Sequence, residues 1–179
     1  RRQRQMCIRD RECSVGSIIR SVYKRFTTLV NQKGIELKVE IPEEELLASV
    51  DKEALTKILS NLFTNALKYA QTYAYLSLSV DEAGKEFTIV MSNDGKIIPI
   101  EMRENIFRPF VQYRDGKDIV PGTGIGLALA RSLAELHQGT LTMDQDMECN
   151  RFILSIPIRH QTASDVSVSY THLTLPTNR

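Results

Sequence analysis

The chain has 179 residues, the size of one domain with short appendages, and its 42% hydrophobic and 25% charged residues are typical of a soluble globular protein. This composition excludes collagen-like, low-complexity and wholly disordered chains. No apolar run reaches the ~18–20 residues of a membrane-spanning helix, so we expect no direct membrane contact from this segment. The net charge of +1 does not indicate nucleic-acid binding by the chain as a whole.

The basic excess lies at one end of the chain. Residues 1–11 hold five Arg against one Asp, which favours an unfolded, solvated end over a nucleic-acid arm. The three cysteines, Cys7, Cys13 and Cys149, fit no metal-ligand spacing. We expect reduced thiols, which indicate a cytoplasmic location.

The first predicted helix covers residues 15–30, and Gly34 ends it. Apolar and charged residues then alternate over 35–41, the period of a half-buried strand. After a short apolar stretch, Asp51 is a good N-cap for a helix that runs to residue 70. The later predicted elements are strands at 74–80 and 86–92, a short helix at 101–106, a helix at 125–137, and strands at 140–143 and 151–157.

These elements predict an α/β two-layer sandwich, with a mixed, mostly antiparallel sheet and helices on one face. We expect the domain to cover residues 14–158. Residues 1–13 are expected to lie outside it, and residues 159–179 to form an unstructured, non-native tail, because they have no sustained periodicity and are rich in Ser and Thr.

The helix at 51–70 carries the first candidate site. Its apolar residues share one face, whereas Asn61, Asn65 and Lys68 lie at i, i+4 and i+7 on another. A solvated helix face is the simplest interpretation of this stripe. The alternative is a ligand site, since an Asn oxygen suits Mg²⁺ and a Lys meets phosphate as a point charge.

Two further segments suit a ligand. Asn93-Asp94-Gly95 follows a predicted strand, although these residue types are also common in ordinary turns. The segment from Gly122 to Leu127 has three alternating glycines at the start of a helix, which can present backbone N–H groups to phosphate. It matches neither the P-loop nor the dinucleotide-binding pattern.

Together these motifs resemble the ATP-binding catalytic domain of sensor histidine kinases, the Bergerat-type fold shared with gyrase, Hsp90 and MutL. Residues 61–69 are similar to its N box, 93–99 to its G1 box, 106–110 to its F box and 122–127 to its G2 box. The amino-acid sequence of residues 121–139 is most similar to that of kinases of hybrid two-component systems.

The resemblance implies an ATP pocket under a lid. It implies that Asn65 coordinates Mg²⁺, that Asn61 and Lys68 lie near the phosphates, and that Tyr69 lies against the adenine. Asn61, Asn65 and Lys68 are the expected catalytic residues. The other residues that the resemblance assigns to ATP are Asn93, Gly95, Ile98, Phe107, Phe110, Arg114, Lys117, Gly122, Thr123, Gly124, Ile125, Gly126 and Leu127.

Phe107 and Phe110 are expected to anchor the start of a lid over residues 111–123, in which Arg114 and Lys117 are candidates for neutralising the γ-phosphate. The three glycines, Gly122, Gly124 and Gly126, let the lid approach the phosphates.

Two positions depart from the family pattern. Asn93 stands where the family has the Asp that accepts a hydrogen bond from adenine, and Ile97 replaces a glycine. If the turn is rotated by one residue, Asp94 could partly substitute for the missing carboxylate. Asn61 stands where hydrolytic relatives have a Glu that activates water, so ATP hydrolysis is expected to be slow.

The resemblance also implies partners. The phosphoacceptor His is expected on a helical hairpin of the same kinase, with a response-regulator receiver domain downstream and a homodimeric parent. His137 is expected to be structural, and His160 and His172 are given no role. The alternatives are a catalytically silent nucleotide-binding scaffold and an ATP-driven clamp of the MutL or Hsp90 type.

Overall fold

The computed structural model describes residues 11–112, 122–144 and 148–159. The expectations for most of the N-terminal segment, for the tail beyond residue 159 and for Arg114, Lys117, His160 and His172 therefore fall outside the described residues. So does most of the expected lid.

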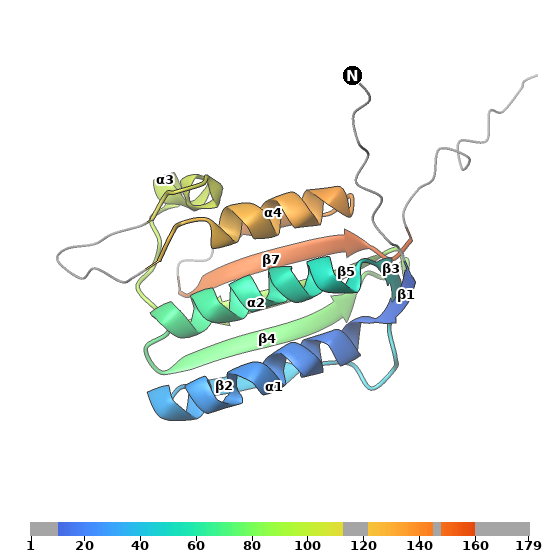
Figure 1. Ribbon diagram of the computed structural model, residues 1–179, viewed down its shortest axis with the longest axis horizontal. Helices are drawn as coiled ribbons and strands as arrows, with labels where there is room; N and C mark the ends of the chain where they lie inside the picture. The colour runs from blue at the N-terminus through green and yellow to red at the C-terminus, as the bar shows by residue number, and fades with distance from the viewer. Residues whose placement is uncertain (1–10, 113–121, 145–147, 160–179) are drawn as a thin grey trace, which may run out of the picture.

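One five-stranded sheet forms one layer of the domain (Figure 1). Its strands are ordered β2-β4-β5-β7-β6, and β2 and β4 are parallel while the other neighbours are antiparallel. This confirms the mixed, mostly antiparallel sheet. The strands are β2 (Glu36–Glu40), β4 (Tyr73–Val80), β5 (Glu86–Asn93), β6 (Thr140–Met143) and β7 (Asn150–Pro157).

A second, two-stranded sheet joins the start of the described chain to the middle of it. Strand β1 (Arg11–Ser14) pairs antiparallel with β3 (Leu47–Val50). The expected domain boundary at Ser14 coincides with the last residue of β1, so the three residues before it are also paired with the fold.

Three long helices cover one face of the large sheet (Figure 1). They are α1 (Val15–Lys33), α2 (Lys52–Tyr69) and α4 (Gly126–Leu136). The predicted helix at 101–106 is divided into the α-helical turn α3 (Ile100–Arg103) and the 3-10 turn η1 (Asn105–Phe107). No helix among the described residues is both long and apolar enough to cross a lipid bilayer.

The ends of α1 and α2 follow from their sequence. The Asp51 carboxylate accepts a hydrogen bond from the Ala54 amide at 3.0 Å, as an N-cap does. Gly34 ends α1 in the left-handed conformation, with φ of 64°.

The core lies between the helices and the sheet, and α2 contributes most of one side of it. The buried residues of this helix are Leu55, Ile58, Leu59, Leu62, Phe63, Ala66 and Leu67. Phe63 also stacks on Phe26 of α1, with ring centroids 5.4 Å apart. Burial of a large apolar side chain contributes about 1.5–3 kcal/mol, so this face fixes the rotation of α2 and leaves its polar stripe outside the core.

His137, directly after α4, connects that helix to the start of α2. The ring is 1% exposed; its Nδ1 donates to the Leu133 carbonyl at 2.7 Å and its Nε2 accepts from the Asp51 amide at 3.1 Å. These contacts confirm the structural role expected for His137.

Candidate functional site

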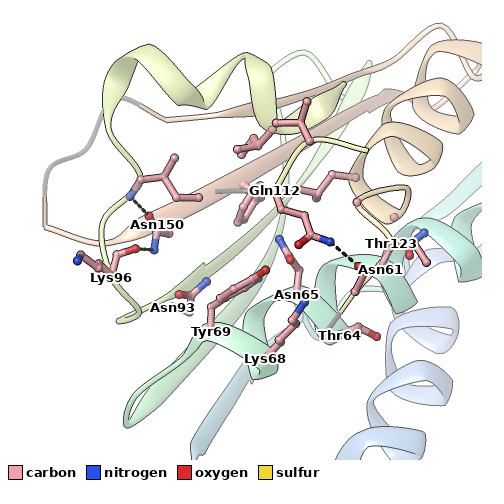
Figure 2. A pocket seen from close by; sticks show the side chains of 18 of the residues that line it. Asn61, Thr64, Asn65, Lys68, Tyr69, Asn93, Lys96, Gln112, Thr123 and Asn150 are labelled. Atoms are coloured by element: carbon pink, nitrogen blue, oxygen red, sulfur yellow. Dashed lines mark hydrogen bonds between the residues drawn. The ribbon is translucent and has the colours of Figure 1, made fainter. Parts of the chain in front are cut away.

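A cavity of about 450 Å³ opens between α2, the end of β5, the start of β7 and the glycine-rich segment before α4. Figure 2 shows the polar side chains that line it. The lining consists of Asn61, Thr64, Asn65, Lys68, Tyr69, Gln71, Asn93, Lys96, Ile98, Ile106, Val111, Gln112, Gly122, Thr123, Gly124, Gly126, Leu127, Asn150 and Phe152.

The wall formed by α2 carries the predicted polar stripe. Asn61, Asn65 and Lys68 all line the cavity and are half-buried, because the core holds the opposite face of the helix. The Lys68 ammonium lies 5.0 Å from the centre of the Tyr69 ring. The stripe is therefore a cavity wall and not a solvated face.

The glycine-rich segment approaches this wall closely. A Cβ on Gly126 would lie 2.9 Å from the Asn61 Oδ1, and one on Gly122 would lie 2.6 Å from the Lys68 Nζ. Gln112 donates a hydrogen bond to the Gly122 carbonyl and joins the two ends of the segment 113–121 (Figure 2). The first and third glycines thus leave room for the α2 side chains.

Position 124 requires a glycine for two reasons, its backbone conformation and the lack of space for a side chain. Its φ is 71°, and a Cβ there would lie 2.9 Å from the carbonyl carbon of Phe110. The Phe110 amide donates to the Gly124 carbonyl at 2.9 Å. Phe110 is 77% exposed, so the residue expected to anchor the start of the lid is held by its backbone and not by its ring.

The floor of the cavity is the turn that follows β5. The Gly95 amide donates to the Asn93 Oδ1 at 3.0 Å, and a Cβ on Gly95 would lie 2.3 Å from the Tyr69 carbonyl oxygen. No side chain fits at Gly95, although the residue does not line the cavity itself. The Asn93 side chain is 2% exposed.

Asn150, which sequence analysis missed, holds this turn in place. Its Oδ1 accepts from the Ile98 amide at 3.0 Å, while its Nδ2 donates to the carbonyls of Gly95, at 3.2 Å, and Lys96, at 2.8 Å. Asn150 is directly opposite Asn93 in the pairing of β5 with β7. No motif marks the residue, because only this register brings it to the floor.

Asp94 does not line the cavity, and its carboxylate is occupied by other partners. Its carboxylate accepts from the backbone amides of Gln71, Thr72 and Tyr73, at 2.8 to 3.2 Å, and from the Thr72 hydroxyl. The expectation that Asp94 could replace a carboxylate at position 93 is therefore wrong for this turn. Instead, Asp94 ties the chain that leaves α2 to the end of β5.

Two opposing effects set the pKa of the Asp94 carboxyl. Burial raises this pKa. Hydrogen bonds from the Thr72 hydroxyl and the backbone amides together lower it by more than burial raises it, so the pKa lies below its ordinary value. A lowered pKa means that folding favours the charged carboxylate, which stabilises the protein above the ordinary pKa. This stabilisation is lost as the pH falls through the lower pKa of the folded state.

We expect Asp94→Asn to lower the free energy of unfolding at neutral pH by about 1–3 kcal/mol, since the amides lose a charged acceptor. The difference from the wild type should shrink as the pH falls below the ordinary Asp pKa of about 3.9 and toward the lower pKa of the folded state, because the unfolded chain then binds a proton that the folded protein does not yet bind. Urea unfolding between pH 3 and pH 7 measures both effects, with Glu82→Gln as a control at an exposed carboxylate of the β4–β5 turn. A difference that does not depend on pH would contradict the role of the charge.

Arg131 of α4 holds the segment around Phe107 beside the cavity. Its guanidinium lies 3.8 Å from the centre of the Phe107 ring, its Nε donates to the Leu141 carbonyl at 2.9 Å, and it pairs with Glu104. The hydrogen bond from Arg131 holds the pKa of the Glu104 carboxyl below its ordinary value. Phe107 itself is buried and packs edge-on against Phe152.

The charge of the cavity wall favours an anion. The described lining includes the cations Lys68 and Lys96 and no carboxylate. Within residues 11–112, 122–144 and 148–159, no group of three or more His, Cys, Asp or Glu side chains could hold a metal ion. The oxygen donors offered to a cation here are therefore amides and hydroxyls, which suit Mg²⁺ when phosphate supplies the charge.

The structure brings most of the predicted site residues together around this cavity. Gly95, Phe107, Phe110 and Ile125 do not line it and act through the backbone or through packing, and Arg114 and Lys117 fall outside the described residues. Residues that line the cavity without having been predicted to bind a ligand are Thr64, Gln71, Lys96, Ile106, Val111, Gln112, Asn150 and Phe152.

Comparison with known proteins agrees with this geometry. Residues 50–160 match the family described as histidine kinase-, DNA gyrase B- and HSP90-like ATPase. Sensor histidine kinase TmoS of Ectopseudomonas mendocina is 32% identical over 78% of the chain. Hybrid signal transduction histidine kinase D of Dictyostelium discoideum is 29% identical over 73% of it.

The chain spans 14% of the length of TmoS and 9% of the Dictyostelium kinase. Among solved structures, the catalytic domain of histidine kinase ThkA matches with a TM-score of 0.72 and 25% identity, over 84% of this chain and 98% of that one. The similarity therefore covers a catalytic domain and extends over nearly all of it.

Proposed function

Because the chain belongs to the histidine kinase-, DNA gyrase B- and HSP90-like ATPase family, we propose that it binds Mg-ATP in this cavity and transfers the γ-phosphate to a histidine. The acceptor would lie on a separate helical hairpin of a two-component sensor kinase. The observation that carries the proposal is one cavity whose lining combines amides, an ammonium and glycine-rich backbone with apolar side chains.

The two ends of the cavity suit the two ends of ATP. Asn61, Asn65, Lys68 and the Gly122–Gly126 backbone supply donors and positive charge, which suit the triphosphate. Ile98, Ile106 and Phe152 supply apolar surface for a purine. In this placement the α2 stripe meets the phosphates and the floor at Asn93 meets the base.

The residues at the phosphate end fit a magnesium ion that is bound together with the nucleotide. Asn65, with Asn61 beside it, would hold the ion through amide oxygen, and phosphate oxygens and water would complete its shell. When bound, Mg²⁺ neutralises and orients the phosphates. The absence of carboxylates from the described lining suits an ion that arrives with its own anionic ligand.

The transfer itself needs positioning more than acid-base chemistry. The bond from the γ-phosphorus to the bridging oxygen of ADP breaks, and a bond from the phosphorus to the acceptor imidazole nitrogen forms. Lys68 would neutralise charge on the phosphates, and Asn61 lies so close to Gly126 that a Cβ there would come within 2.9 Å of the Asn61 Oδ1. Since Asn61 cannot activate water as a base, we expect hydrolysis to be slow relative to transfer.

The proposal extends to the parent protein, which we expect to be a cytoplasmically exposed, homodimeric kinase that passes phosphate to a receiver domain. Two alternatives remain. A silent scaffold would bind ATP without transfer, as the departures at Asn93 and Ile97 suggest. A clamp of the MutL or Hsp90 type would hydrolyse ATP, which Asn61 disfavours.

Two measurements separate these functions. The first is calorimetry with ATP, in Mg²⁺ and in EDTA, and the second is transfer of labelled γ-phosphate to an added histidine hairpin. Binding followed by an acid-labile label on the hairpin supports the kinase. Binding without label supports the scaffold, and ATP-dependent dimerisation with turnover supports the clamp. No binding would contradict all three.

We expect Asn93→Asp to tighten ATP binding by several-fold. A carboxylate accepts hydrogen bonds more strongly than an amide, and one of its oxygens can keep the bond from the Gly95 amide. Calorimetry with Mg-ATP measures the change, with urea unfolding to confirm that the floor is intact. Weaker binding in a folded variant would mean that another group contacts the adenine amino group.

A further inference from the structure

Gln112 lines the cavity although it was not predicted to bind a ligand, and its carboxamide contacts the glycine-rich segment. Its Nε2 donates a hydrogen bond to the Gly122 carbonyl, which can only accept one. Figure 2 shows this side chain directed into the cavity, toward Asn61 of α2. Gln112 therefore brings a neutral donor to the space beside the wall that carries Asn61, Asn65 and Lys68.

The Gln112 amide and the Lys68 ammonium converge on one small space at Gly122. A Cβ on Gly122 would lie 2.6 Å from the Lys68 Nζ and 3.7 Å from the Gln112 Nε2, and the glycine places no side chain there. Two donors on different sides of one space suit a phosphate group, because its separate oxygens can each accept a hydrogen bond.

The burial of the cavity lining indicates which phosphate reaches this space. Asn93 on the floor is 2% exposed, whereas Gly122 and Thr123 at the rim are exposed. When the base lies on the floor, the triphosphate extends toward the rim, and its terminal phosphate lies outermost. Transfer to a histidine on a separate hairpin also requires the terminal phosphate to lie on the solvent side, within reach of the acceptor.

Resting on the proposed function, we propose that Gln112 binds the γ-phosphate and distinguishes ATP from ADP. A phosphate oxygen is a stronger acceptor than a backbone carbonyl because it is charged, so the Gln112 Nε2 exchanges the Gly122 carbonyl for the phosphate. The exchange costs little, since Gly122 is exposed and water can hydrogen-bond to its carbonyl. ADP has no phosphate that reaches this space, and in its complex Gln112 keeps the bond to Gly122.

Calorimetry of the full chain with Mg-ATP and with Mg-ADP tests this assignment. The readout is the dissociation constant for ADP divided by that for ATP. We expect Gln112→Ala to lower this ratio about fivefold to tenfold, the loss expected when a hydrogen bond to a charged group has replaced a bond to a neutral one. The affinity for ADP should change by less than about twofold. General damage to the cavity would weaken both nucleotides and leave the ratio unchanged.

Two variants accompany this measurement. Gln112→Glu keeps the length of the side chain but places a negatively charged acceptor beside the phosphate, so it should lower the ratio at least as far as Gln112→Ala does. Gln32→Ala removes an exposed glutamine of α1 outside the cavity and should change neither dissociation constant. Urea unfolding establishes that each variant is folded.

An unchanged ratio in a folded Gln112→Ala variant that binds ATP overturns the role of Gln112 and leaves the proposed function standing. Equal losses of affinity for ATP and for ADP overturn it as well, because the lost contact would then not involve the γ-phosphate. Failure of the wild type to bind either nucleotide contradicts the proposed function and the inference together.

Discussion

Asn65→Ala is expected to abolish the Mg²⁺-dependent part of ATP affinity. The side chain lies in the middle of the α2 wall, between Asn61 and Lys68, and offers a neutral oxygen to an ion that phosphate also holds. Losing this ligand should lower the affinity for Mg-ATP at least about tenfold, in the range found when a group that supports a metal site is removed. The affinity measured in EDTA should stay close to that of the wild type.

Two further variants make this result specific. Asn65→Asp keeps an oxygen donor at the same position and should retain the Mg²⁺ dependence. Asn31→Ala removes an exposed Asn of α1 outside the cavity and should change neither measurement. If Asn65→Ala binds Mg-ATP as tightly as the wild type does, Asn65 is not a metal ligand.

Gly124→Ala is expected to impair phosphoryl transfer far more than nucleotide binding. The substitution strains a backbone with φ of 71° and drives a Cβ to within 2.9 Å of the Phe110 carbonyl carbon. The hydrogen bond from the Phe110 amide to the Gly124 carbonyl joins the two ends of the segment between them, so this contact must shift. We expect transfer to an added histidine hairpin to fall by about 10²-fold, because misplacement of about 1 Å is enough for that loss.

Adenine binding should change little in this variant, because Gly124 lies in the part of the cavity that we propose for the phosphates. Dissociation constants for ADP and rates of label transfer give the two readouts. Hydrogen exchange at the Phe110 amide should also become faster. Equal losses in ADP binding and in transfer would mean that the substitution damages the cavity as a whole.

Gly84→Ala is the matched control for backbone strain. Gly84 has φ of 65°, but a Cβ there would have no atom within 4 Å, and the residue lies in the turn between β4 and β5. It should cost about 1–2 kcal/mol of stability from conformation alone. Transfer in Gly84→Ala should remain close to that of the wild type when the protein is folded.

The sequence by itself determined the three long helices, the strands of the large sheet and the polar stripe of α2. The apolar period of α2 requires that Leu59 and Phe63 face the core, and the same period places Asn61 and Asn65 one turn apart on another face. The cap at Asp51 and the glycine after α1 fix the ends of these helices. All of these are local effects, because each depends on residues within one or two helical turns.

Only the tertiary structure decided how the floor is built and what Asn93 can offer. Asn150 reaches Gly95 and Ile98 because β7 pairs with β5 in one register. The Asp94 carboxylate is occupied outside the cavity lining, because three amides beyond α2 donate to it. The Gly95 amide likewise decides which end of the Asn93 carboxamide is left for a ligand. Some of these contacts join residues that are remote in sequence, and the others depend on how a turn packs against such residues. Neither the spacing of residues nor the composition of the chain predicts which remote residues meet.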